Sequence, residues 1–194
     1  MFYGKSAVLV VTSSSRQLLI ASRNRKSGNP LDYRVYQVLG RTTQDTIVFM
    51  QSELRLAQQT VLFDQDATAA LYRDTITVPG ADSCKCISCQ NFAAQRGRVF
   101  PEAFIQFLKE LGVDPLKEWE AFDYDFDARN AKRSVLCGGW FLFVGQVVEG
   151  LDKRREQPDG GFAYWFTTNF PTGTLPPHLK LCAVEFLGQI PWVL

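Results

Sequence analysis

Three cysteines crowd into one short segment, Asp82-Ser-Cys-Lys-Cys-Ile-Ser-Cys-Gln-Asn-Phe92. Thiolates are ligands that Zn²⁺ prefers, and Cys86 and Cys89 have the C-x2-C spacing of half a tetrahedral site. Cys84 can supply a third ligand. A fourth ligand must come from another part of the chain, where the candidates are Cys137, Cys182 and His178. The segment therefore predicts a structural zinc site held by Cys84, Cys86 and Cys89.

Two alternative roles for these cysteines stay open. The second C-x2-C or H-x3-H half that makes a zinc motif specific is missing, so the three can instead be free thiols in a turn, packed as small hydrophobic groups. They can also be redox-active or catalytic thiols. A Cys–His pair for nucleophilic catalysis would have to use His178, the only histidine in the chain.

An acidic and aromatic stretch, Phe122-Asp-Tyr-Asp-Phe-Asp127, is the second candidate site. In a strand, alternate side chains point to opposite faces, so its three aspartates would share one face and its aromatic residues the other. That acidic face is either a solvated outer surface, a surface that docks a basic partner, or a divalent-metal site. In the docking form the aspartates supply charge and a nearby aromatic ring is the anchor. The expected partner-binding residues are Asp123, Asp125, Asp127, Trp119 and Tyr124.

Other catalytic motifs are missing from the sequence. It contains no G-x-x-x-x-G-K-[ST] loop and no G-x-G-x-x-G, and a single histidine rules out an H-E-x-x-H pair. A Mg²⁺-dependent hydrolase built on the acidic stretch has no motif to support it. We therefore expect a protein that is not an enzyme.

The elements that must position these residues follow from periodicity. Tyr33–Leu39, Thr46–Met50 and Thr75–Val78 are rich in β-formers and predict strands, whereas Ser52–Gln59 suits a short helix with Ser52 as its cap. Aromatic and leucine residues recur at helical spacing from Phe100 to Leu111, which predicts a helix that begins at a proline.

The carboxyl-terminal third returns to strands, over residues 135–148, 162–168 and 181–190. Strands, then a helix, then strands indicate an α+β fold, an antiparallel sheet packed against one or two helices. We expect a β-rich segment over residues 1–70, either separate or part of the same fold, and an α+β domain over residues 71–194.

Composition limits the class of protein. The 194 residues are 46% hydrophobic and 21% charged, which is enough to form a packed core. The net charge is only +1, but residues 1–50 hold seven basic residues against two acidic ones, so this part is either a basic patch within the fold or an arm for an anionic partner. No run is long and apolar enough to span a membrane. An odd number of closely spaced cysteines argues against a disulfide framework, so we expect a cytoplasmic protein.

Three segments of the last 120 residues or so resemble a family of bacterial proteins without an established activity. They are the C-x-C-x2-C-x-N-F segment, the strand Gly138-Gly-Trp-Phe-Leu-Phe-Val-Gly145 and the ending Ile190-Pro-Trp-Val-Leu194. The resemblance also takes in Val78-Pro-Gly80 and the helix that follows Phe100. It implies a bacterial protein, and it implies no activity. Residues 1–70 lie outside it.

These observations lead to two hypotheses. The leading one is a non-enzymatic bacterial protein that binds another protein, for example an immunity-type inhibitor of a toxin, with no cofactor. The alternative is a zinc-stabilised module that recognises nucleic acid or protein, in which the three cysteines hold the metal.

Overall fold

The computed structural model of the protein describes residues 18–23, 32–41, 46–124, 134–150, 161–173, 175 and 179–194, with side chains from residue 52 onward. All strand pairs in these ranges are antiparallel. No helix in these ranges has the length and apolar character needed to cross a lipid bilayer. The chain divides into two compact units, described in turn.

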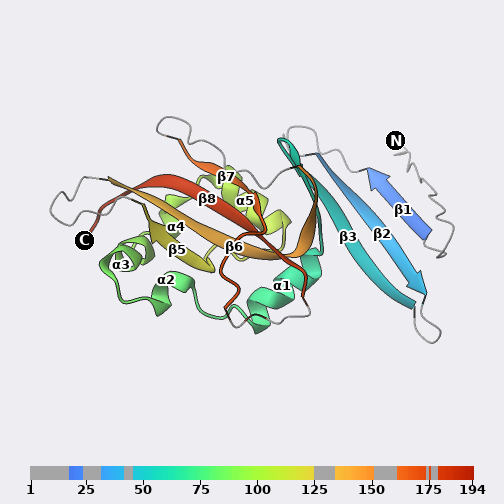
Figure 1. Ribbon diagram of the computed structural model, residues 1–194, viewed down its shortest axis with the longest axis horizontal. Coiled ribbons are helices and arrows are strands. Elements are labelled where there is room, and N and C mark those ends of the chain that lie inside the picture. The colour runs from blue at the N-terminus through green and yellow to red at the C-terminus, as the bar shows by residue number, and fades with distance from the viewer. Residues whose placement is uncertain are drawn as a thin grey trace. The chain divides into compact units, whose positions relative to one another are not determined.

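The first unit, residues 1–64 and 145–151, is built from strands. Consecutive strands pair in chain order, and the last of them also pairs with the end of β6 (Figure 1). The strands are β1 (Leu18–Arg23), β2 (Asp32–Arg41), β3 (Thr46–Leu56), β4 (Gln59–Phe63) and β6 (Ser134–Glu149). The strands expected at residues 33–39 and 46–50 are confirmed.

The helix expected at Ser52–Gln59 is wrong, because these residues continue β3 and turn into β4. Leu54 and Leu56 are buried while Arg55 between them is exposed, which is the period of two that belongs to a strand. Ala57 has a φ of 53°, the backbone conformation that a tight two-residue hairpin turn requires. The alternation outweighs the capping preference of Ser52.

The second unit, residues 65–144 and 152–194, combines a sheet with helices. β6 pairs with β5 on one edge and with β8 on the other, and β7 pairs with β8. The elements are α1 (Gln65–Asp74), α2 (Gly80–Ser83), α3 (Ile87–Ala93), α4 (Arg96–Val99), α5 (Glu102–Glu110), β5 (Glu120–Asp123), β7 (Ala163–Thr167) and β8 (Leu181–Pro191). The expected α+β class with an antiparallel sheet is confirmed. The division into a β-rich segment over residues 1–70, separate or part of the same fold, and an α+β domain over residues 71–194 stays a prediction.

An aromatic core joins α5 to the sheet. Phe104, Phe107 and Leu108 on the inner face of α5 are buried, as the helical stripe predicts. Just before the helix, the Phe100 ring lies 5.0 Å from the ring of Phe186. It is also 5.4 to 6.0 Å from four further rings: Phe92, Phe104, Phe141 and Phe162. Burying each such ring stabilises the fold by about 2 to 3 kcal/mol, so this core fixes the sheet against which the cysteine segment packs.

α1 packs along the edge of β6 that also pairs with β5, at the residues that follow the paired ones. The Thr68 hydroxyl accepts a hydrogen bond from the Val144 amide and the Tyr72 hydroxyl accepts one from the Leu142 amide, each at 3.0 Å. These hydroxyls satisfy β6 amides that would otherwise need a strand partner. The strand expected at Thr75–Val78 is wrong, because these residues form the irregular connection from α1 to α2.

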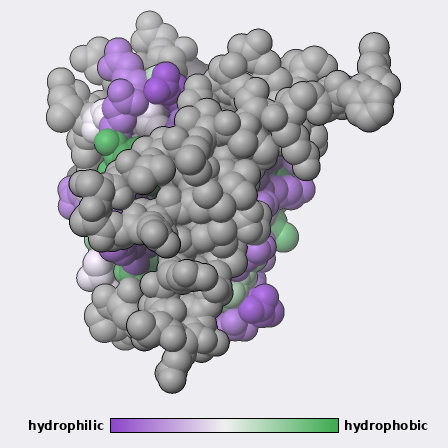
Figure 2. All heavy atoms as spheres, turned by 90° about the vertical axis from the view of Figure 1, so that its right-hand side faces the viewer, coloured by the Kyte–Doolittle hydropathy of each residue, from purple (hydrophilic) through white to green (hydrophobic). Residues whose placement is uncertain are grey.

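Some large hydrophobic side chains are exposed among the described residues. On the face drawn in Figure 2, the coloured residues are mostly hydrophilic, with smaller hydrophobic areas between them. Apart from the adjacent pair at the end of the chain, the exposed large hydrophobic side chains come from different segments: Val78, Ile87, Leu116, Tyr124, Val148, Val193 and Leu194. Isolated side chains of this kind are normal on protein surfaces, so exposure by itself identifies no binding site.

Candidate metal centre

The cysteine segment connects two short helices. Pro79 caps the beginning of α2, and the chain leaves this helix at Cys84 in an extended conformation. Cys86 is the residue before α3, and its sulfur accepts a hydrogen bond from the Cys89 amide at 3.4 Å. A thiol at this position satisfies one of the amides that a helix leaves unpaired at its beginning. Local capping therefore turns Cys86 toward Cys89.

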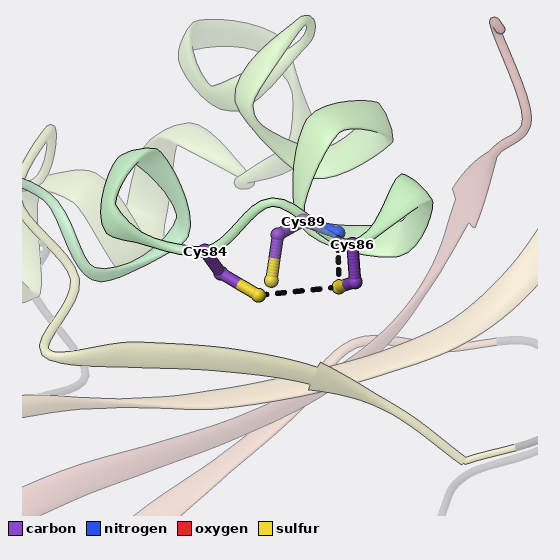
Figure 3. A group of neighbouring side chains, drawn as sticks. All are labelled: Cys84, Cys86 and Cys89. Atoms are coloured by element: carbon purple, nitrogen blue, oxygen red, sulfur yellow. Dashed lines mark hydrogen bonds between the residues drawn. The ribbon is translucent and has the colours of Figure 1, made fainter.

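The three sulfurs converge on one point. Their Sγ atoms all lie within 4.8 Å of one another, and those of Cys84 and Cys86 are 3.3 Å apart. Figure 3 shows the three side chains pointing toward each other from the connection and from the first turn of α3. Zn–S bonds of about 2.3 Å in a tetrahedron place sulfurs about 3.8 Å apart. The observed spacing brackets that value, so the predicted ligand set fits a zinc ion.

The site has a solvent side and a protein side. Cys84 and Cys86 are exposed, whereas Cys89 is buried and its thiol lies 3.8 Å from the Ala121 carbonyl oxygen on β5. Hydrogen bonds from the Cys86 backbone and from the neighbouring thiols lower the pKa of Cys84. Burial raises the pKa of Cys89. The exposed thiol of Cys84 therefore loses its proton more easily than the buried thiol of Cys89.

Cys137 does not complete the site. Its sulfur is buried in β6, 3.6 Å from the Gly138 carbonyl oxygen, and it is not part of the three-sulfur group. It shares with Cys89 a cavity of about 10 Å³, which is at the lower limit for one water molecule. Burial, with the charges of Asp123 and Glu118, raises the pKa of Cys137 to about 12. This thiol behaves as a small hydrophobic side chain.

Cys182 is farther away. It pairs with Phe143 across the sheet, whereas Cys137 pairs with Gly188, so six residues of β8 separate the two positions. Six strand residues span about 20 Å. His178 lies outside the described residues. Within the described ranges, the sulfurs of Cys84, Cys86 and Cys89 thus form a group of three, and the fourth ligand is not among the described side chains.

The acidic stretch is described only from Phe122 to Tyr124. Asp123 ends β5 opposite Cys137, half-buried, and lines the cavity beside Cys89. The Phe122 ring lies over Gly138, where a Cβ would come within 2.9 Å of the ring. Asp123 therefore points to the helix side of the sheet, and the aromatic ring to the opposite side. Asp125 and Asp127 lie outside the described residues.

The two expected aromatic anchors differ in accessibility. The Trp119 indole donates a hydrogen bond to the Pro171 carbonyl oxygen at 2.7 Å, which holds its ring against the chain. Tyr124 is 37% exposed, and its ring lies 5.1 Å from that of Phe122. Phe122 in turn packs 4.6 Å from Trp140. The assignment of these residues to a partner stays a prediction, with Tyr124 the more accessible.

Sequence reasoning missed the residues that hold the segment in place. The buried Asn91 amide group donates to the Pro191 carbonyl oxygen at 3.0 Å and accepts from the Val193 amide at 2.7 Å. The Asn-Phe that follows the third cysteine, together with the Ile-Pro-Trp ending, was the available signal. Glu118 and Arg96 form an ion pair at 2.8 Å, and neither residue stands out in the sequence because charged residues are usually exposed.

A groove lies beside α1. It measures about 630 Å³ and lies between α1 and the connection that follows α5. Lys117 at its wall donates to the Tyr72 carbonyl oxygen and lies 3.6 Å from the Asp114 carboxylate. Acidic and basic groups alternate around it, so it presents no single ligand chemistry.

No protein-family model, no curated protein and no solved structure matches the chain. The resemblance to a bacterial family stays a prediction. In the structure, the cysteine segment and the end of the chain are in contact, since Asn91 binds the Ile190–Leu194 ending and the rings of Phe92 and Phe186 stack at 6.2 Å. These are structural contacts, and they carry no chemistry.

Proposed function

We propose that this chain is a zinc-stabilised protein-recognition module in which Cys84, Cys86 and Cys89 hold one metal ion. The observation that supports the proposal is the convergence of three sulfurs within 4.8 Å. Sulfur ligands select soft or borderline ions, among which zinc is the common structural one. The module is proposed to be non-enzymatic, and its role is to present a surface to a partner.

The metal would supply order that the segment does not obtain from burial. Lys85, Cys86 and Ile87 are exposed, so this stretch contributes little to the apolar core. An ion held by three thiolates would join the end of α2 to the first turn of α3. Metal binding of this kind acts as folding free energy for the segment.

Equilibrium titration tests this proposal. Reduced protein competes with a chromophoric chelator for zinc, and the expected dissociation constant is about 10⁻⁷ M or tighter. Cys89→Ser should weaken binding by at least about a hundredfold, because it removes the buried ligand. Cys182→Ala, which removes a buried thiol outside the site, is the control and should bind as the wild type does. Wild-type protein that binds no more tightly than Cys89→Ser contradicts the proposal.

A docking surface around Tyr124 is the second candidate function. It is favoured by one observation: Tyr124 is exposed and its ring is supported from below by Phe122 and Trp140. Aromatic side chains held in this way are common anchors of protein interfaces. The proposed partner is a protein with a basic surface, such as a toxin, which acidic side chains on the Tyr124 side of the sheet would complement.

Quantitative recovery of a partner tests the docking surface. Tyr124→Ala and Val148→Ala both remove an exposed apolar side chain, and only the first lies in the proposed surface. The partner should be lost with Tyr124→Ala and retained with Val148→Ala. A partner set that is the same for wild type and Tyr124→Ala would sink this candidate, and recovery of nucleic acid would point to a different class of partner.

A further inference from the structure

A buried ionic network joins residues that lie before and after the three cysteines. The Arg96 guanidinium donates to both oxygens of Glu118, from Nε at 2.8 Å and from Nη2 at 3.0 Å. Nη2 also donates to Asp82 at 2.8 Å. The Glu118 side chain is fully buried and that of Arg96 is 13% exposed, whereas Asp82 is 41% exposed. Glu118 is therefore the centre of the network and Asp82 its outer end.

Glu118 also fixes the helix that precedes the cysteines. Its carboxylate accepts a hydrogen bond from the Ala81 amide at 3.0 Å, and its carbonyl oxygen accepts one from the Gly80 amide at 2.8 Å. A Cβ at Gly80 would collide with the Trp119 carbonyl oxygen, so only glycine allows this close approach. The beginning of α2 is thus bound to the chain that leads into β5.

Arg96 anchors the other side of the segment. It is the first residue of α4, which follows α3, and its guanidinium lies 5.9 Å from the centre of the Phe92 ring. Asp82 lies two residues before Cys84, and Arg96 lies seven residues after Cys89. Both flanks of the segment are therefore tied to one buried carboxylate.

A fully buried carboxylate is an unusual way to stabilise a fold. Removing a charge from water is unfavourable, and an ion pair of this kind is often no better than a hydrophobic pair of similar volume. What a bidentate Arg–carboxylate pair adds is a fixed geometry. The geometry it fixes here is the separation between the ends of the stretch that carries the three thiols.

We infer that Glu118 and Arg96 are positioning residues for the three-cysteine site, holding α2 and α4 so that the sulfurs converge before any metal binds. The inference rests on the proposed metal-binding function. It predicts that loosening the network lowers metal affinity even where the protein remains folded. Residues that only orient ligands typically change metal affinity by about 10- to 100-fold.

Zinc competition on a set of folded variants tests the inference. Glu118→Gln keeps the shape but loses the charge, and Arg96→Lys keeps the charge but loses the two-pronged geometry. Both should weaken zinc binding by at least about tenfold, and Asp82→Asn at the exposed end by about threefold. Asp74→Asn breaks an exposed ion pair with Arg73 in the same unit and should stay within about twofold of the wild type. Circular dichroism verifies that each variant is folded.

A second readout needs no zinc. Phenylarsine oxide binds pairs of thiols that lie close together, so its uptake by metal-free protein reports the convergence directly. Uptake should be slower in Arg96→Lys and Glu118→Gln than in Asp74→Asn. If Glu118→Gln does not fold, Arg96→Lys decides the test.

The outcomes separate the two claims. Wild type that binds zinc, with Arg96→Lys and Glu118→Gln within twofold of it, overturns the positioning role and leaves the metal site. Wild type that binds no zinc removes the proposed function, and arsenical uptake alone then judges the network. Slower uptake of the arsenical by Arg96→Lys than by Asp74→Asn supports the positioning role, and equal rates of uptake overturn it.

Discussion

The five cysteines of the chain lie in two regions of the second unit, and the two regions differ in how far they expose the thiols to solvent. Cys84, Cys86 and Cys89 converge on a connection between two helices, with two of the three sulfurs exposed. Cys137 and Cys182 are buried in adjacent strands, 3% and 2% exposed. The first region gathers thiols where a ligand can reach them, and the second uses them to fill space.

The difference lies in how spacing along the chain becomes spacing in three dimensions. In a connection that begins a helix, neighbouring residues fold back within one turn, so C-x-C-x2-C is enough to bring sulfurs together. In a sheet, the pairing register of the strands decides which residues are neighbours. Here Cys137 pairs with Gly188, which lies about 20 Å along β8 from Cys182. Cysteines at large sequence separation therefore predict a common site poorly.

Alkylation of metal-free protein gives the largest expected contrast between the regions. Cys84 and Cys86 should react with iodoacetamide at rates close to those of free thiols. Cys137 and Cys182 react only after the core opens, which should slow them by at least about a thousandfold. Mass spectrometry of peptides over time measures both. Equal labelling of Cys137 and Cys84 would break the comparison.

Truncating one side chain in each region should have very different costs. Phe100→Ala leaves a cavity among five aromatic rings and should lower the free energy of unfolding by about 3 to 5 kcal/mol. Ile87→Ala in the cysteine segment removes a side chain that is 48% exposed. It should change the free energy of unfolding of metal-free protein by about 0.5 kcal/mol or less. Chemical denaturation followed by circular dichroism compares them. Similar losses for the two variants would contradict the assignment of the core.

The parts that the sequence could predict are those in which local pattern decides structure. The stripe of α5 and the strands β2, β6 and β8 follow from periodicity, and the cysteine group follows from spacing. The prediction fails at Ser52–Gln59 because a capping residue suggests a helix more strongly than a short alternation suggests a strand. The contacts of Glu118 with Arg96 and of Asn91 with Pro191 join residues 22 and 100 positions apart, so only the folded chain reveals them.

One substitution made in both regions sharpens the comparison. Cys182→Ser places a hydroxyl in a site that is 2% exposed, and it should destabilise the protein by about 1 to 3 kcal/mol. Cys84→Ser exchanges a solvated thiol and should change the stability of metal-free protein by less than about 0.5 kcal/mol. Thermal unfolding in the presence of a chelator measures both. A larger loss for Cys84→Ser would mean that its thiol serves the fold rather than a metal.

Zinc affinity should depend on pH in a way that distinguishes the thiols within the segment. Because the pKa of Cys89 is raised, this thiol is protonated at neutral pH and its proton must leave when zinc binds. Affinity should therefore fall by at least about tenfold for each pH unit below 8. Cys84 has a lowered pKa, so its thiol is protonated in the free protein only at lower pH. There zinc binding must release one more proton, and the affinity should depend on pH more steeply. Competition titrations at several pH values measure this, and an affinity that is constant with pH would exclude thiolate ligation.

The metal content of the purified protein tests the central claim most directly. Protein prepared under reducing conditions with zinc supplied is analysed by inductively coupled plasma mass spectrometry, beside a variant in which Cys84, Cys86 and Cys89 are all serine and beside Cys137→Ala. We predict about one zinc ion per chain in the wild type and in Cys137→Ala, and none in the triple variant. Folded wild-type protein that carries no more zinc than the triple variant would contradict the account.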